Sequence, residues 1–199
     1  MSMNFYNVIE HRRSHYALGR EKVVEEARVK EIVEFAVKHV PSPFNSQSAR
    51  VVVLFDGQSD RLWDITKEAL RPLVPAAAFG ATEEKLKGFA AGYGTVLFFE
   101  DQAIVEGLQR EFALYKDNFP IWSLQSNGML EFAVWTGLEA EGLGASLQHY
   151  NPLIDDAVRR EWNLPDSWKL LAEMPFGKPL ADPGPKDFRP LEERVLTFG

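Results

Sequence analysis

An arginine pair followed by a hydroxyl group stands near the start of the chain. Arg12 and Arg13 are adjacent and Ser14 follows them, within the stretch HRRSHYALGR at residues 11–20. Guanidinium groups present several donors in one plane, which suits phosphate oxygens, and the serine hydroxyl adds another donor. The same arginines could instead complement the dipole at the end of a short helix. The pair therefore indicates either a phosphate site or an ordinary helix end.

Sequence motifs for most other kinds of chemistry are missing. The chain has no cysteine, which excludes thiolate catalysis, and its four histidines lack the spacing of metal ligands. The stretches GLGASL (142–147) and GYGTVL (92–97) follow predicted helices and precede predicted strands, the reverse of a dinucleotide-binding loop. We therefore expect no metal site, and we nominate no side chain as nucleophile, acid or base.

Composition narrows the class of protein. The chain has 199 residues, of which 45% are hydrophobic, so we expect residues 1–199 to form one domain with a sizeable core. A net charge of −7 argues against nucleic-acid and anionic-membrane partners, which both require a basic surface. We find no apolar run long enough to span a bilayer and no signal-peptide core, so we expect a cytoplasmic protein.

The helices and strands that must position the arginines do not alternate regularly along the sequence. This order favours a mixed α+β fold with a few buried strands over a Rossmann domain. Hydrophobic periodicity predicts helices at 5–12, 25–40, 60–74, 83–92, 103–119, 128–144 and 154–163. β-Branched and apolar runs predict buried strands at 49–57, 94–101, 145–150 and 169–177.

Several single residues are expected to begin or end these helices. Ser59 or Asp60 can cap the helix at 60–74, and Thr82 can cap the helix at 83–92. Pro41 and Pro43 should end the helix at 25–40, and Pro120 should end the helix at 103–119. The long apolar helix at 128–144 should leave through a left-handed glycine, either Gly142 or Gly144.

The C-terminal tail differs from the rest of the chain. Residues 180–199 are rich in proline and should run extended, yet they end in the apolar, strand-like stretch RVLTF. Such an arm rarely packs on itself, so we expect it to embrace a second copy of the chain. The alternative is an ordinary surface tail.

Four stretches carry a family resemblance, namely RRSHYALG, VPSPFNSQSARVVVLF, GLEAEGLGASLQHYNP and KDFRPLEERV. In this order and at this spacing they resemble the FMN-dependent nitroreductase family, most closely its fungal-type branch, which also occurs in bacteria. The resemblance covers nearly the whole chain. It implies a three-layer α/β/α fold with a central, mostly antiparallel sheet, in an intertwined homodimer whose C-terminal arms are exchanged.

The resemblance also implies the residues that hold FMN. Arg12, Arg13 and Ser14 match the segment that binds the phosphate and ribityl chain, and Tyr16 stands where the family often has a basic residue. At the other end of the chain, Lys186 and Arg189 match a basic contact to the phosphate, with Arg189 better placed in the spacing. Two further segments match the family pattern, Ser42, Pro43, Phe44, Asn45 and Gln47 in the first and Leu147, Gln148, His149 and Tyr150 in the second.

By resemblance, Ser42 to Phe44 reach the flavin of the partner subunit, while Asn45 and Gln47 shape the pocket. A polar loop between helix and strand would contain similar residues. Residues 147–150 should offer backbone N–H groups to flavin N5 and O4, although His149 could equally be a hydrogen-bonded core histidine. Phe119 and Trp122 either stack on flat substrates or fill the core between helices.

The implied function is an FMN-dependent NAD(P)H oxidoreductase of the nitroreductase or quinone reductase type. NADH or NADPH would deliver a hydride to flavin N5 and leave, and a nitroaromatic, quinone or similar acceptor would take the electrons in the same slot. The alternatives are a flavin-binding stress-response or regulatory protein with little turnover and, from another class, a helical interaction domain without a cofactor.

Overall fold

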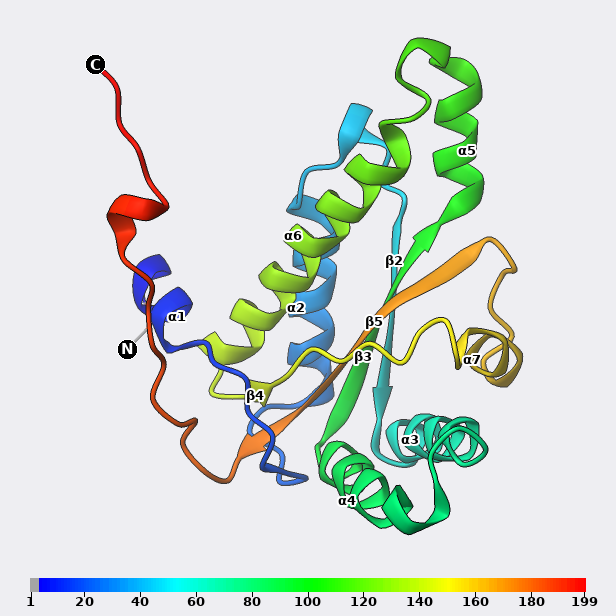
Figure 1. The fold of residues 1–199 in the computed structure, drawn as a ribbon, viewed down its shortest axis with the longest axis vertical. Helices are drawn as coiled ribbons and strands as arrows, with labels where there is room; N and C mark the ends of the chain where they lie inside the picture. The colour runs from blue at the N-terminus through cyan, green and yellow to red at the C-terminus, as the bar shows by residue number, and fades with distance from the viewer. Residues whose placement is uncertain (1–3) are drawn as a thin grey trace.

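A five-stranded antiparallel sheet lies at the centre of the computed structural model, which describes residues 4–199 (Figure 1). The strand order is β1-β5-β3-β2, and the short β4 also pairs with β5. The strands are β1 (Leu18–Gly19), β2 (Ala49–Phe55), β3 (Gly94–Asp101), β4 (Gly144–Ala145) and β5 (Trp168–Pro179).

Helices cover both faces of this sheet, which confirms the α+β, three-layer prediction. Helices α2 (Glu26–His39) and α6 (Phe119–Ala140) share one hydrophobic core with the sheet. The opposite core includes side chains from α3 (Asp56–Leu70), α4 (Phe79–Ala90) and α7 (Asp155–Glu161). Two further helices, α1 (Phe5–His11) and α5 (Gln102–Glu111), contact α6.

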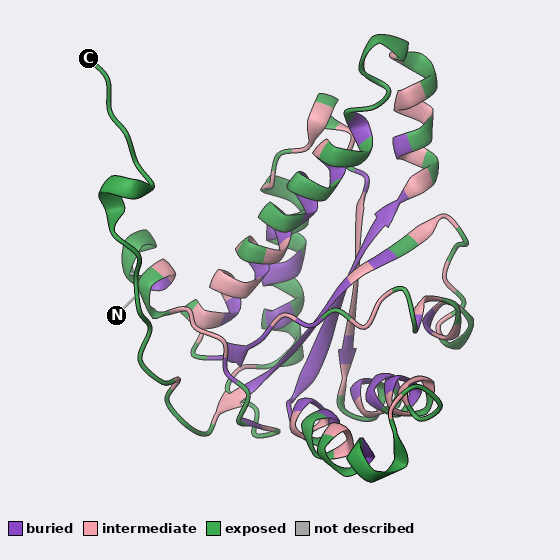
Figure 2. Ribbon diagram, in the orientation of Figure 1, coloured by how far each residue is buried: buried purple, intermediate pink, exposed green. Residues whose placement is uncertain are grey.

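Strand β3 lies inside the sheet, between the two helical layers, and all of its residues are buried (Figure 2). Because side chains alternate along a strand, Val96 and Phe98 face α2 and α6, while Leu97 and Phe99 face the other helical layer. Burying each of these large side chains stabilises the fold by roughly 1.5–3 kcal/mol. The apolar run of β3 is therefore explained by two cores rather than one.

Two predicted helix caps are wrong. Helix α3 begins at Asp56, immediately after β2, so Ser59 and Asp60 lie inside it. The Ser59 hydroxyl is buried and lies 2.7 Å from the Thr95 hydroxyl, which gives this polar side chain a role in the core. Helix α4 begins at Phe79, so Thr82 lies within the helix and caps nothing.

The predicted boundary at Pro120 is also wrong. Helix α5 ends at Glu111, because Phe112 leaves the helical region with φ −117° and ψ 66°. Helix α6 then starts at Phe119 and carries Pro120 in its first turn, where the missing N–H would have no helical partner. The helix runs for 22 residues, and Gly142 with φ +81° provides the predicted left-handed exit.

Two predicted strands are less regular than expected. Of the predicted strand at 145–150, only Ala145 belongs to β4, and Gln148 adds a single bridge to Glu173. Strand β2 is an edge strand whose residues are mostly half-buried, with Leu54 alone fully buried. An apolar groove of about 540 Å³ lies between β2 and α2. The sequence had predicted a buried strand here.

The C-terminal tail leaves the sheet extended and runs past α1 away from the rest of the fold (Figure 1). It contains one short 3₁₀ turn at Leu191–Glu193, and the stretch RVLTF belongs to no strand. Its large apolar side chains are exposed, at Leu180, Phe188, Leu191, Val195, Leu196 and Phe198.

Candidate functional site

The arginine segment and the 144–150 segment lie side by side at one end of the sheet. Ser14 forms a parallel bridge with Ala145, and the His15 N–H donates to the Ala145 carbonyl at 2.9 Å. Because β4 pairs with β5, these contacts attach the arginine segment to the sheet. Two of the four segments predicted to hold the cofactor are therefore adjacent.

Arg12 packs against helix α6. Its guanidinium carbon lies 4.4 Å from the centre of the Trp135 ring and 5.9 Å from that of Phe132, within the range of a cation–π contact. Burial lowers the pKa of Arg12, and the nearby carboxylate of Glu139 opposes this effect. Arg12 is thus a partly buried cation, unlike an arginine that merely ends a surface helix.

Several buried polar atoms around Arg12 have no hydrogen-bond partner within residues 4–199. They are Arg12 Nε, His15 Nδ1, Trp135 Nε1 and Glu139 Oε2. A buried polar atom left unpaired costs about 1–3 kcal/mol. Burial also raises the pKa of Glu139, against the influence of His15, His11 and Arg12. Arg12 Nε and Trp135 Nε1 are unpaired donors beside a positive charge, which suits an anionic ligand that accepts hydrogen bonds.

A cleft of about 560 Å³ opens beside Arg12 and His15. Its lining comes from residues 12–17 and from residues 181–186 of the tail. The Arg13 guanidinium donates to the Gly184 carbonyl at 2.7 Å, which closes one wall. Lys186 and Tyr16 belong to the lining, whereas Arg189 is exposed outside it. The structure thus brings Arg12, Arg13, Ser14, Tyr16 and Lys186 together, but not Arg189.

The segment at Ser42–Gln47 lies at the opposite end of α6. Phe44 packs on an aromatic cluster there, formed by Phe112, Tyr115, Phe119 and Trp122. A groove of about 360 Å³ runs between the Phe44 segment and the Trp122 side of α6. Phe119 is only 1% exposed and belongs to the core, as the alternative expected, while Trp122 lines the groove.

The backbone of this segment is strained. Phe44, Asn45 and Gln47 have φ angles of 55°, 53° and 48°, in the left-handed region that ordinary side chains rarely adopt. Each such residue costs of order 1–3 kcal/mol, and such strain collects at functional sites. Phe44 nevertheless keeps 54% of its surface exposed. A strained loop that presents an aromatic ring to solvent is unusual for a simple connection.

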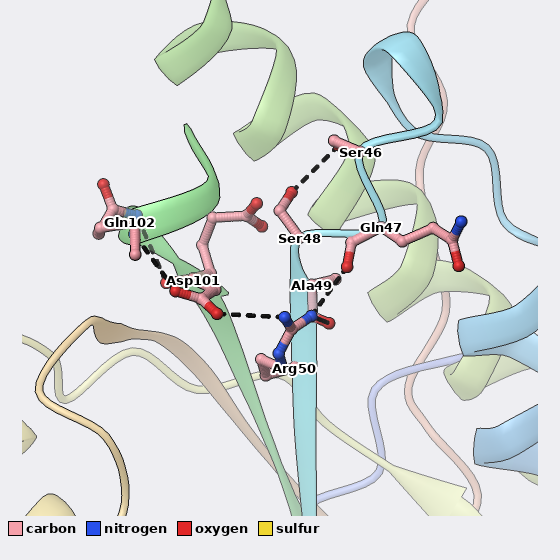
Figure 3. Close-up of polar contacts among 9 residues, drawn as sticks. Ser46, Gln47, Ser48, Ala49, Arg50, Asp101 and Gln102 are labelled. Carbon is pink, nitrogen blue, oxygen red and sulfur yellow. Dashed lines mark hydrogen bonds and ion pairs between the residues drawn. The ribbon is translucent and has the colours of Figure 1, made fainter. Parts of the chain in front are cut away.

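Polar contacts that the sequence did not reveal anchor this loop to the sheet (Figure 3). Arg50 donates to the Gln47 carbonyl at 2.8 Å and to Asp101 at 3.1 Å, and the Ser46 and Ser48 hydroxyls lie 3.3 Å apart. In the sequence, Arg50 stands at the start of one apolar run and Asp101 at the end of another. These two charges come together only because β2 and β3 pair antiparallel, so the sequence alone did not indicate their contact.

Glu100 and Asn127 extend the same support into the core. The Asn127 amide donates at 3.0 Å both to the Phe99 carbonyl and to the Glu100 carboxylate. Burial raises the pKa of Glu100, and hydrogen bonds from Ser48 and Asn127 oppose that effect. These contacts tie α6, β3 and the 46–48 loop into one unit.

The two groups of predicted residues are far apart within one chain. Arg12 contacts Trp135, and Phe44 contacts Trp122, thirteen positions earlier on the same helix. At 1.5 Å per residue this separates them by about 20 Å. A single chain therefore presents two half-sites, one at each end of α6.

The 147–150 segment follows β4, which contacts the arginine segment. The Gln148 side chain is buried and donates to the Ser146 hydroxyl at 3.1 Å, so it serves the core. His149 is exposed, which rules out the alternative of a core histidine. Tyr150 is half-buried and its ring packs on Trp63. Only the backbone and the exposed His149 side chain are available to a ligand here.

Other kinds of site are not found in the part of the chain that the structure describes. Residues 4–199 contain no group of three or more His, Cys, Asp or Glu side chains placed to hold a metal ion. None of the helices described here has the length and apolar character needed to cross a membrane.

Comparisons with known proteins identify the family. The sequence model of the Nitroreductase family matches residues 9–178. Nitroreductase FRM2 of Saccharomyces cerevisiae is 35% identical over 187 residues, which cover 93% of both chains. The structure of nitroreductase CinD from Lactococcus lactis superposes with a TM-score of 0.91 at 46% identity, over 98% of this chain and 100% of that chain.

A nitroreductase structure from Saccharomyces cerevisiae is also similar, with a TM-score of 0.78 and 32% identity over 88% of this chain and 95% of that chain. The matches in sequence and in structure thus span the sheet, both helical layers and both half-sites. The chain belongs to the nitroreductase family of flavin-dependent oxidoreductases.

Proposed function

We propose that this protein is an FMN-dependent NAD(P)H oxidoreductase that reduces nitroaromatic and quinone acceptors in a site shared by two copies of the chain. The observation that carries the proposal is the cleft beside Arg12, where the unpaired Arg12 Nε and His15 Nδ1 atoms and the start of the tail meet, with unpaired atoms of Trp135 and Glu139 nearby. A ligand with a phosphate and a polyhydroxyl chain supplies both the charge and the hydrogen bonds that these atoms lack.

The proposed cofactor contacts follow from the two adjacent segments. Arg12, Arg13, Ser14 and Lys186 would hold the phosphate end, because they line or border one cleft. When bound, FMN carries electrons from a nicotinamide donor to the acceptor. The chain itself binds, orients and shields. No catalytic acid or base is required of it, and the half-buried Glu139 carboxylate near Arg12 faces cations.

The shared site explains the distance between the half-sites. We infer that Phe44 of the partner subunit completes the site that Arg12 begins, since one chain holds these residues about 20 Å apart along α6. Helix α6 supports this inference because it keeps large apolar side chains exposed on its outer face, at Ile121, Leu124, Met129 and Phe132. A second copy of the chain would cover them.

The tail supports the same assembly. Its six exposed apolar side chains each gain roughly 1.5–3 kcal/mol when buried. Strand β2 offers an unpaired edge beside an apolar groove, and such edges invite an added strand. We infer that the arm at residues 180–199 packs on the partner subunit, with Arg189 brought toward a phosphate only in the assembled dimer.

The acceptor class rests on the aromatic half-site and on a relative. Phe44 and Trp122 border one groove with nearly parallel rings, an arrangement suited to a flat ring. CinD has been solved with chloramphenicol and with 4-nitrophenol, which both carry a nitrobenzene ring, and with nicotinic acid, the acid form of the nicotinamide ring. A nitroaromatic acceptor and a nicotinamide donor that use one slot in turn fit both observations.

The visible spectrum of the purified protein tests the proposal. We expect a yellow protein that NADH or NADPH bleaches without air and that menadione or a nitroquinoline reoxidises with turnover. A folded, colourless protein that refuses added FMN would refute the proposal. A flavin-bound protein that turns over no acceptor would instead favour the regulatory alternative.

A further inference from the structure

A carboxylate without solvent contact lies beneath the 147–150 segment. Glu173, in the middle of β5, is 0% exposed, and its Oε2 atom accepts a hydrogen bond from the Tyr150 N–H at 2.9 Å. Its backbone exchanges two hydrogen bonds with Gln148, one from the Gln148 N–H at 2.7 Å and one to the Gln148 carbonyl at 3.0 Å. Glu173 therefore holds the segment at two residues, Gln148 through its main chain and Tyr150 through its side chain.

This double contact determines which N–H groups remain available. In an extended segment successive N–H groups point in opposite directions. The N–H groups of Gln148 and Tyr150 point toward Glu173, whereas those of Leu147 and His149 have no acceptor within residues 4–199. The segment thus offers a ligand two donors, separated by one residue, on the side away from β5.

We propose that Glu173 is a positioning residue for the flavin site, which fixes residues 147–150 so that the Leu147 and His149 N–H groups are the donors presented to the flavin ring. This inference rests on the proposed function and narrows the resemblance, which had treated all four residues of the segment alike. In particular, it removes Tyr150 from the set of backbone donors.

The chemistry at position 173 favours this role over a simple packing role. Its neighbours along β5, Ala172 and Met174, are fully buried, and so is Leu97, its register partner in β3. A carboxylate here is costly, because burial raises the pKa of Glu173 to about 8 and the nearby Asp155 acts in the same direction. An apolar residue would avoid that cost but would leave the Tyr150 N–H unpaired and the segment unfixed.

Two substitutions separate positioning from packing. Glu173→Gln keeps an oxygen that can accept from Tyr150, so we expect the absorption spectrum, the flavin midpoint potential and FMN affinity close to those of the wild type. Glu173→Leu fills the space but removes the acceptor. We expect it to weaken FMN binding roughly tenfold or more and to make the midpoint potential more negative.

A matched control is Thr66→Val, which removes a buried hydroxyl of α3 whose hydrogen bond, to the Leu62 carbonyl, stays within that helix. It should lower stability and leave the potential unchanged. A folded Glu173→Leu variant with the spectrum and potential of the wild type would overturn the positioning role. A Glu173→Gln variant as impaired as Glu173→Leu would overturn it too.

Hydrogen exchange on the wild type tests the inference even if Glu173→Leu does not fold. Without flavin, we expect slow exchange at the Gln148 and Tyr150 amides and fast exchange at Leu147 and His149, which FMN should then slow. Equal exchange at Tyr150 and Leu147 would contradict the inference. A wild type that binds no FMN would defeat the proposed function, while slow exchange at Tyr150 would still support its contact with Glu173.

Discussion

The Arg13 guanidinium donates to the Gly184 carbonyl at 2.7 Å and joins residues 171 positions apart in the sequence. The tail is held at its root by two more contacts, the Leu180 N–H to the Ala17 carbonyl at 2.9 Å and the Lys178 ammonium to Glu21 at 2.6 Å. The tail therefore starts from the wall of the cleft beside Arg12, which we propose holds the cofactor. Any partner that grips the outer part of the tail will also stabilise that wall.

The first prediction concerns recognition of the phosphate by Arg12. Arg12→Ala should weaken FMN binding by roughly 10–100-fold, because a charge-assisted hydrogen bond contributes about 1.5–3 kcal/mol. Riboflavin has no phosphate, so its affinity should change much less. Fluorescence titration with both flavins measures the ratio. Arg61→Ala is the control, since this exposed arginine pairs with Glu161 and should leave both affinities unchanged. An equal loss for both flavins would contradict phosphate recognition.

The second prediction concerns the arm. Removing residues 190–199 deletes three exposed apolar side chains of RVLTF but leaves Lys186 and Arg189 in place. We expect light scattering to show a monomer, or a dimer that dissociates on dilution, and flavin content to fall with it. Arg189→Ala in the full chain should lower FMN affinity without changing the oligomeric state. A truncated protein that remains a tight, fully flavinated dimer would show that the arm is an ordinary surface tail.

The third prediction tests whether each site is shared between subunits. At FMN concentrations too low to saturate Arg12→Ala, this variant and a double variant, Phe44→Ala with Gln47→Ala, should each give homodimers with little activity by disabling opposite half-sites. Mixing equal amounts and allowing exchange should restore about one quarter of wild-type activity, because half of the dimers are mixed and each contains one intact site. Activity that stays at the level of the separate variants would place both half-sites in one chain.

Much of the fold could be predicted because its central elements have strong local patterns. The β-branched and aromatic run of β3 and the apolar stripe of α2 each specify one structure, and both are confirmed. The start of α6 could not be found this way, since Pro120 is compatible with a helix stop and with a first turn. The choice depends on Phe112 and Phe119 packing under Phe44, which is a tertiary contact.

The candidate site was predictable where a ligand needs unusual residue types, as at Arg12 and Arg13. Its supporting residues were missed because they recognise other parts of the chain. Arg50 meets Asp101 only after β2 and β3 pair, and Glu173 meets Tyr150 only after the 146–151 segment folds onto β5. One signal was nevertheless present, since an acidic residue interrupts the otherwise apolar run KLLAEMPFG. A charge at a core position indicates a backbone or ligand partner.

The last prediction concerns stability and pH. Burial raises the pKa of Glu173 to about 8 and that of Glu131 to about 7, so the folded chain holds these protons more tightly than the unfolded chain. The contribution of these two protons to the free energy of unfolding is complete below about pH 4.5. It is lost as the pH rises through the pKa values of the folded state, by at most about 1.4 kcal/mol per pH unit for each group.

Glu173→Gln carries no titrating proton at this position. Compared with the wild type, its free energy of unfolding in urea should therefore improve steadily between about pH 5 and pH 8. The comparison cancels the opposite trend from Glu68 and Glu161, whose pKa values are lowered by bonds to Arg71 and Arg61. Parallel stability curves for the two proteins would show that Glu173 stays charged in the core.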